Sequence, residues 1–222
     1  MTSPTSLLRR EWPTLLALAA NAALIAWSWP RQPLQVPVHW NLLGQPDRYG
    51  GRFEALVAVP LVLLLPMLLT WALQVNGPAR NALLFRVTRF GLALLSLSLT
   101  AHAAFGWTPG RSALLGVGLL FTLLGNVMGK AQPNRYVGFR TPWTARSRLA
   151  WQRGQRRSGV FLVSVGVLVL LTAAVVPAAA LVPWVMPLGF LTLLLGGIGW
   201  LVWRSYQDYR ADPDPRSPFQ NT

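Results

Sequence analysis

Five stretches of this chain carry no Asp, Glu, Lys or Arg, and they restrict its fold more than any other feature. They are Trp12–Pro30, Ala55–Ala79, Phe90–Gly110, Ser112–Gly129 and Ser158–Trp203. An apolar, uncharged run of about 18 residues or more can cross a hydrocarbon core of about 30 Å. Only helices and closed barrels satisfy their backbone polar groups in lipid. Because the runs are continuous in Leu, Ala and Val and lack the alternation of barrel strands, they predict an all-α, polytopic membrane protein.

The last stretch is too long for one span, and Pro177 and Pro183 divide it, since proline disfavours a continuous helix. We therefore predict six transmembrane helices, at about 12–29, 55–76, 88–107, 112–129, 158–177 and 183–204. The first run continues to Trp29, which is longer than the core of a cleaved signal peptide and favours a retained helix.

The charges of the chain predict its orientation. Of 26 charged residues, 20 are basic and six acidic, a balance that in a soluble protein indicates nucleic-acid binding. Here the basic residues lie in short connections between apolar segments, so we expect no direct contact with nucleic acid. If both termini are cytoplasmic, 16 basic residues lie inside and four outside, as the positive-inside rule requires. The absence of cysteine excludes disulfides and thiolate metal sites.

The first long connection, 31–53, is predicted to lie outside. Its prolines favour extended backbone, and the segment from Gly44 to Asp47 favours a turn, around which His39, Asn41 and Asp47 converge. These side chains either satisfy backbone groups of the turn, with Asp47 paired to a nearby arginine, or contact a ligand or peptide. They are too few for a metal site, and no nucleophile and base are present for hydrolysis.

The second unusual connection, 130–157, holds eight of the basic residues. Its Gly and Asn permit unusual backbone angles, and its Arg and Trp make strong contacts. Thr141 before Pro142 is typical of a helix N-cap and first-turn proline, so we expect a short helix at about 142–155 along the inner surface. The loop is either a clamp for anionic lipid headgroups or a docking surface for a protein.

Polar side chains inside spans are functional by default. Asn126 is placed to hydrogen-bond a neighbouring helix or the following loop. His102 has no partner acid in another span, which favours packing or hydrogen bonding over a proton relay. We interpret the glycines of the fourth and sixth spans as sites of close helix packing; they are Gly116, Gly118, Gly196, Gly197 and Gly199.

Two motifs carry a family resemblance. The inner motif consists of Gly125, Asn126, Met128, Lys130, Asn134, Gly138, Arg140, Thr141, Pro142, Trp143, Thr144 and Trp151. The outer motif consists of Pro37, His39, Asn41, Gly44, Asp47 and Tyr49. The inner motif resembles the signature of the SdpI family of bacterial membrane immunity proteins. The outer motif is similar to the domain of unknown function that commonly precedes it.

The resemblance implies a non-enzymatic protein of the bacterial cytoplasmic (inner) membrane that gives immunity to a secreted antimicrobial peptide toxin. It also implies recruitment of a cytoplasmic repressor when toxin is present. The toxin would meet the outer motif, and the repressor would dock on the inner motif. No cofactor or metal is implied, and the oligomeric state stays open.

The resemblance and the predicted spans divide the chain into four parts. They are a cytoplasmic N-terminus (1–11), an N-terminal three-helix region (12–107) with the outer loop, an SdpI-like three-helix region (108–204) with the cytoplasmic loop, and a disordered tail (205–222). One alternative is a small transporter or exporter of peptide or lipid, which needs paired ionisable groups in spans or broken helices in matching repeats. An intramembrane hydrolase needs a catalytic set that the sequence does not supply.

Overall fold

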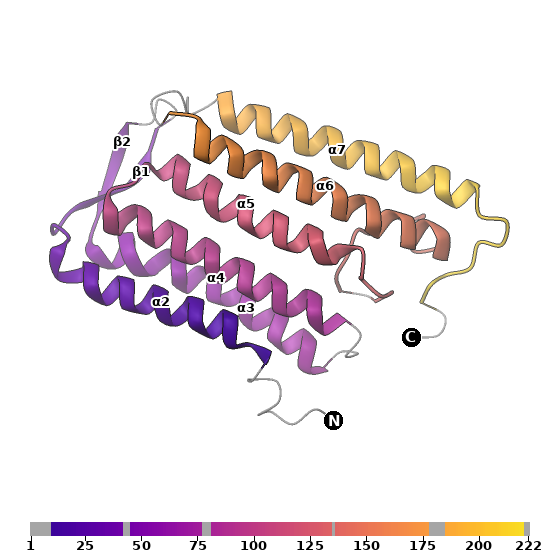
Figure 1. The fold of residues 1–222 in the computed structure, drawn as a ribbon, viewed down its shortest axis with the longest axis horizontal. Helices are drawn as coiled ribbons and strands as arrows, with labels where there is room; N and C mark the ends of the chain where they lie inside the picture. Colours follow the sequence, from indigo (N-terminus) through magenta and orange to yellow (C-terminus); the bar gives the residue numbers. More distant parts are fainter. Residues whose placement is uncertain (1–9, 42–44, 77–80, 135, 178–184, 220–222) are drawn as a thin grey trace.

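The apolar stretches form six long helices in the part of the chain that the structure describes, and these helices lie side by side (Figure 1). A computed structural model describes residues 10–41, 45–76, 81–134, 136–177 and 185–219. The helices are α2 (Trp12–Ser28), α3 (Val59–Asn76), α4 (Ala82–Phe105), α5 (Pro109–Met128), α6 (Arg148–Val175) and α7 (Val185–Arg210). A 3₁₀ turn, η1 (Trp29–Arg31), follows α2, and a π-helical turn, η2 (Glu54–Ala58), leads into α3.

A small hairpin is the exception to the all-α prediction. Strand β1 (Val36–Trp40) pairs antiparallel with β2 (Pro46–Gly50), and the register shifts twice along the pair. The extended backbone predicted from the prolines of this loop is therefore present. Apart from the hairpin, the described structure consists of helices and their connections, so the all-α prediction is confirmed with this one addition.

Local sequence signals set several helix ends. Gly106 ends α4 with a φ of 66°, a left-handed conformation that favours glycine. Pro109 then occupies the first turn of α5, where its missing N–H costs no hydrogen bond. Ser147 caps α6, because its side chain accepts a hydrogen bond of 3.0 Å from the N–H of Ala150.

Three helices extend beyond their predicted bounds into charged sequence. Helix α4 begins at Ala82 rather than 88, and α6 begins at Arg148 rather than 158. Helix α7 continues to Arg210, so residues 205–210 form its last turns rather than part of a disordered tail. The predicted bounds stopped at charged residues, because an unpaired charge is costly in hydrocarbon. Several of these charges have partners on neighbouring helices, as described below.

The separate inner helix predicted at 142–155 is wrong. Residues 142–146 form turns, and α6 runs without a break from Arg148 to Val175. Thr141 caps no helix; its hydroxyl accepts a hydrogen bond from the N–H of Thr144 and closes a local turn. The helix starts later because Ser147 supplies the side-chain cap.

Small residues let four helices approach one another closely. A Cβ built on Gly116 or Gly118 of α5 would lie less than 3 Å from a side chain of α4 or α6, respectively. A Cβ on Gly197 of α7 would likewise lie less than 3 Å from the ring of Phe161 of α6. The packing interpretation is therefore confirmed for these three glycines. It is wrong for Gly196 and Gly199, which have open space where a side chain would lie.

Five helical segments are long and apolar enough to cross a membrane, and the chain is a multi-pass membrane protein. The segments are Glu54–Val75, Ala82–Phe105, Gly110–Met128, Arg148–Val175 and Leu188–Arg210. Helix α2 has 17 residues, the lower limit for a span. The sixth span, predicted at 12–29, therefore stays a prediction.

The path of the chain gives the bundle two different ends (Figure 1). The hairpin lies at one end, beside the start of α5 and the end of α6. The start of α2, the end of α7 and the connection between α5 and α6 lie at the opposite end. We call these the hairpin end and the loop end.

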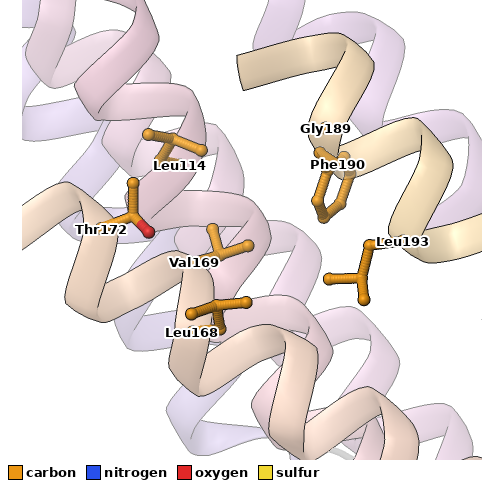
Figure 2. Close-up of a pocket in the computed structure, with 7 residues that line it drawn as sticks. All are labelled: Leu114, Leu168, Val169, Thr172, Gly189, Phe190 and Leu193. Atoms are coloured by element: carbon orange, nitrogen blue, oxygen red, sulfur yellow. The ribbon is translucent and has the colours of Figure 1, made fainter. Parts of the chain in front are cut away.

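Helix α7 lies at the edge of the bundle (Figure 1) and leaves a pocket of about 250 Å³ near its start. Phe190 and Leu193 of α7 face Leu168 and Val169 of α6 across this space (Figure 2). The lining is almost entirely apolar, and it consists of Leu114, Leu168, Val169, Thr172, Gly189, Phe190 and Leu193.

Candidate functional site

The hairpin brings together the polar side chains that the sequence placed around its turn. His39 on β1 and Asp47 on β2 lie with Nδ1 and Oδ1 2.6 Å apart, and both side chains are exposed. Asn41 accepts a hydrogen bond of 3.0 Å from the N–H of Gln45 through its side-chain oxygen. Asp47 therefore pairs with histidine rather than with an arginine, whereas Asn41 satisfies a backbone group of the turn, as one of the two interpretations predicted.

Two further residues of the outer motif have different surroundings. Tyr49, two residues after Asp47 on β2, is 56% exposed. Gly44, the predicted turn glycine, lies outside the described residues. At the base of the hairpin, Arg48 donates a hydrogen bond of 2.5 Å to Glu54 at the start of η2.

His102 of α4 fastens the hairpin to the bundle. Its ring packs edge-on against Trp40 of β1, with centroids 4.9 Å apart. Its Nδ1 also hydrogen-bonds the carbonyl oxygen of Trp107, beyond the end of α4. The interpretation of His102 as a packing and hydrogen-bonding residue is confirmed.

At the loop end, Asn134 organises the connection between α5 and α6. Its Oδ1 accepts hydrogen bonds from the N–H groups of Tyr136 and Val137, at 2.8 and 2.7 Å. Its Nδ2 donates to the carbonyl oxygens of Gln132 and Val137. The side chain is 5% exposed, so Asn134 shapes the loop from within and is not itself available to a partner.

Gln155 of α6 holds the next part of the loop. Its side chain accepts from the N–H of Phe139 at 2.9 Å and donates to the carbonyl oxygen of Phe139 at 2.8 Å. Gly138 beside it has a φ of 116°, and a Cβ there would lie 2.9 Å from the Gln155 oxygen. Glycine is therefore required at 138 both by backbone conformation and by space.

The Thr-Pro-Trp-Thr segment joins the loop to α7. The hydroxyl of Thr141 lies 2.9 Å from the hydroxyl of Ser205, and both residues are buried. Trp143 packs its ring against Tyr206 at 5.3 Å between centroids. Pro142 between them is exposed.

Trp151, the last residue of the inner motif, is a buried contact point for other parts of the chain. It is 1% exposed, and its indole N–H donates a hydrogen bond of 3.0 Å to the carbonyl oxygen of Ala131. Its ring packs edge-on against Phe219 near the C-terminus, with centroids 5.5 Å apart. The guanidinium of Arg140, itself exposed, lies 5.6 Å from the same Phe219 ring.

Among the first residues of the inner motif, one packs between helices and two are exposed. A Cβ on Gly125 would lie 2.6 Å from the carbonyl oxygen of Gly159 and from the amide nitrogen of Val163, so this glycine lets α5 and α6 touch. Asn126 and Lys130 are exposed. The motif thus consists of buried residues that build the loop and exposed residues that surround it.

Comparison with known proteins identifies both parts of the chain. Residues 130–204 match the model of the SdpI/YfhL protein family, and residues 16–64 match a domain of unknown function, DUF1648. The C-terminal region of this chain is similar to the SdpI/YfhL family. A curated relative, the immunity protein SdpI of Bacillus subtilis (strain 168), is 29% identical over 143 residues, which cover 62% of this chain and 68% of the relative. No solved structure matches the chain.

The two matches include one group of site residues each. The DUF1648 match contains the whole hairpin, including the His39–Asp47 pair. The SdpI/YfhL match contains the inner loop from Lys130 onward, together with α6 and most of α7, while Gly125 and Asn126 precede it. The resemblance stated from the sequence is confirmed.

Sequence analysis predicted no role for Asp208, which lies four residues beyond the SdpI/YfhL match. This α7 carboxylate is 3% exposed and accepts hydrogen bonds from Arg153 and Arg157 of α6. In the sequence, Arg153 and Arg157 indicate only the cytoplasmic side of the membrane. One feature of the sequence could have indicated an ion pair at Asp208: it is one of six acidic residues among 20 basic ones.

A second buried ion pair lies in the N-terminal helices at the loop end. Arg89 of α4 donates to both carboxylate oxygens of Glu11, at 2.5 and 3.2 Å, and to the side-chain oxygen of Gln74 of α3 at 2.5 Å. The guanidinium also lies 5.2 Å from the ring of Trp71. The sequence does not predict this cluster, because Glu11 and Arg89 lie just outside the charge-free stretches and far apart in the chain.

The site residues divide into a hairpin-end group and a loop-end group, and the structure does not bring the two groups together. Among the described residues, no group of three or more His, Asp or Glu side chains lies close enough to hold a metal ion. What the arrangement offers is recognition surface: an exposed acid, histidine and tyrosine at one end, and arginine with aromatic rings at the other.

Proposed function

We propose that this protein gives the cell that makes it immunity to a secreted antimicrobial peptide toxin. It acts as a six-span protein of the bacterial cytoplasmic membrane, with both termini in the cytoplasm, and has no enzymatic activity. The observation that carries the proposal is that the motif residues between Asn134 and Trp151 form one folded loop, tied to α6 and α7, within the region that matches the SdpI/YfhL family. The likeness to an immunity protein supports the same function.

The hairpin is the proposed toxin contact. His39, Asp47 and Tyr49 are exposed, and the hairpin end carries few of the basic residues, as expected for the outer side. An exposed carboxylate and an exposed aromatic ring on the same strand suit a cationic, amphipathic peptide. Tyr49 is 56% exposed, so part of its ring is accessible to such a ligand.

The inner loop is the proposed docking place for a cytoplasmic repressor. A chain of contacts supports coupling between the two ends: Trp40 packs on His102 of α4, α4 packs on α5 at Gly116, and α5 leads directly into the loop. Toxin binding outside would change repressor affinity inside if the two ligands favour the same arrangement of these helices.

A protection assay tests the immunity proposal. The protein is expressed in toxin-sensitive cells, and survival is measured against a panel of secreted peptide toxins, with membrane insertion checked by immunoblot. We expect protection from at least one toxin and its loss in His39→Ala and Asp47→Ala. Arg52→Ala, which alters a half-buried hairpin-end residue outside the pair, serves as the matched control. Absence of protection by well-inserted protein across the panel would contradict the proposal.

Repressor docking has a separate test. Co-purification of a candidate repressor with the membrane protein should fall on Arg140→Ala or Trp143→Ala and persist in Arg52→Ala at the other end. Equal recovery with all three variants would remove the loop from the proposal and leave immunity standing.

Transport of peptide or lipid is the second candidate, and the buried Glu11–Arg89 pair is the observation that favours it, since paired ionisable groups mark transport pathways. The pair lies near the loop-end termini of α2 and α4. Flux of a fluorescent peptide or lipid in liposomes containing the purified protein would support transport. Lack of flux together with cellular protection would favour immunity by binding.

A further inference from the structure

The last described residues, 211–219, fold back onto the inner loop; we call them the tail segment. Beyond α7 the chain contains prolines at 213, 215 and 218, which prevent a helix and favour extended backbone. Residues 213–216 are exposed. The segment is therefore held mainly at its two ends, by Asp212 and by Phe219.

Phe219 provides the aromatic anchor. Its ring packs edge-on on Trp151, at 81° between ring planes, and the Arg140 guanidinium lies near its face. Edge-to-face aromatic pairs and cation–π contacts both stabilise such an arrangement. Pro218 beside it is buried. Two residues of the inner motif, Arg140 and Trp151, are thus in contact with a segment of the same chain.

Asp212 provides the polar anchor. The hydroxyl of Ser147 donates a hydrogen bond of 2.5 Å to its carboxylate. Ser147 is the N-cap of α6, so the carboxylate lies at the positive end of that helix. The Ser147 hydrogen bond holds the pKa of the Asp212 carboxyl below its ordinary value.

We propose that Arg140, Trp151 and Ser147 form a peptide-binding site for an extended segment that carries a carboxylate and, several residues later, an aromatic ring. The tail segment is the resident ligand of this site. A segment held at two points, with exposed residues between them, exchanges at low free-energy cost. A cytoplasmic partner that docks on the inner motif presents the same two groups and displaces Phe219. This last step rests on the proposed function, whereas the site itself does not.

Peptide binding to the full-length protein tests the site. The probe is a fluorescein-labelled, amidated peptide with the sequence of residues 211–219, and the receptor is purified protein in lipid nanodiscs. We expect the peptide to bind the Phe219→Ala protein about tenfold more tightly than the wild type, whose own ring occupies the site. Phe219→Tyr, which keeps a ring, is the matched control and should behave as the wild type.

Two further arms identify the contacts. A peptide with alanine in place of its phenylalanine should lose binding to the Phe219→Ala protein. Adding Arg140→Ala to that protein should weaken the intact peptide severalfold. Equal affinity for wild type and Phe219→Ala, or no binding to either at concentrations that saturate the fluorescence signal, would overturn the proposal. Because no toxin or repressor is present, its failure leaves the protection assay unaffected, and a failed protection assay leaves the peptide result unaffected.

Discussion

Arg89 of α4 and Glu11, 78 residues earlier, form an ion pair with both side chains almost completely buried. The pair joins the start of α2 to α4, and Gln74 brings in the end of α3. One nitrogen of the Arg89 guanidinium, Nη1, has no hydrogen-bond partner among the described residues. The three N-terminal helices therefore meet at a polar cluster at the loop end, while apolar contacts such as Ala17, Met67 and Ala93 join them along their length.

Arg89→Met is expected to destabilise the protein by about 3–5 kcal/mol, because Glu11 would remain as a buried charge without a partner. The double variant Glu11→Gln with Arg89→Met should recover part of this loss, since neither charge remains. Thermal unfolding in detergent measures both. The exposed pair of Arg48 and Glu54 provides the control, and Arg48→Ala should change stability by about 1 kcal/mol or less. Additive losses in the double variant would contradict a direct pair.

Gly125→Ala is expected to cost about 1–3 kcal/mol, because its Cβ would meet backbone atoms of α6 that cannot move alone. Gly196→Ala in α7 is the matched control, since nothing lies within 4 Å of its Cβ position. That substitution should be neutral or stabilising by up to about 1 kcal/mol, as alanine favours a helix over glycine. Resistance to thermolysin distinguishes the two, and equal effects would show that α5 and α6 do not touch at Gly125.

Asn134→Ala should loosen the inner loop, since it removes the acceptor for two backbone N–H groups. A buried donor left unsatisfied costs about 1–3 kcal/mol. Asn134→Asp keeps that acceptor, although its second oxygen would face the carbonyl oxygens of Gln132 and Val137. The two amides should therefore stay better protected than in Asn134→Ala, whatever the change in overall stability. Hydrogen exchange at the amides of Tyr136 and Val137 reports the difference. Similar exchange rates in both variants would assign the effect to the lost donations instead.

The attachment of the tail segment should depend on pH in the acidic range. The Ser147 hydroxyl lowers the pKa of Asp212 in the folded protein, so the carboxylate favours attachment. This contribution is complete above the ordinary aspartate pKa of about 3.9 and is lost as pH falls through the lowered value. Because the chain has no cysteine, a spin label on Pro215→Cys reports the mobility of the segment alone.

We expect the label to become mobile as the pH falls below about 4, and Asp212→Asn to abolish that transition. The same transition in Asp212→Asn would assign it to another group, such as Asp214, which pairs with Arg216.

Much of the architecture follows from the sequence, because membrane helices are encoded locally. An uncharged run long enough to cross lipid has few alternatives to a helix. The extended backbone of the hairpin and the special backbone at Gly138 were also within reach, since proline and glycine act on their own residues. The helix predicted at 142–155 failed because the Thr141 side chain closes a turn, and a better cap, Ser147, lies further along.

What the sequence determined by itself is the class of protein, the number of long helices and the two motifs that link it to known families. What the tertiary structure decided is which charged residues pair. Each of the six acidic side chains has a hydrogen-bond or ion-pair partner. Because the chain contains 20 basic residues, the sequence alone does not specify which of them pairs with which acid. Glu11 with Arg89, and Asp208 with Arg153 and Arg157, join helices distant in sequence. Such pairs depend on how the helices pack, and a local sequence pattern does not predict helix packing.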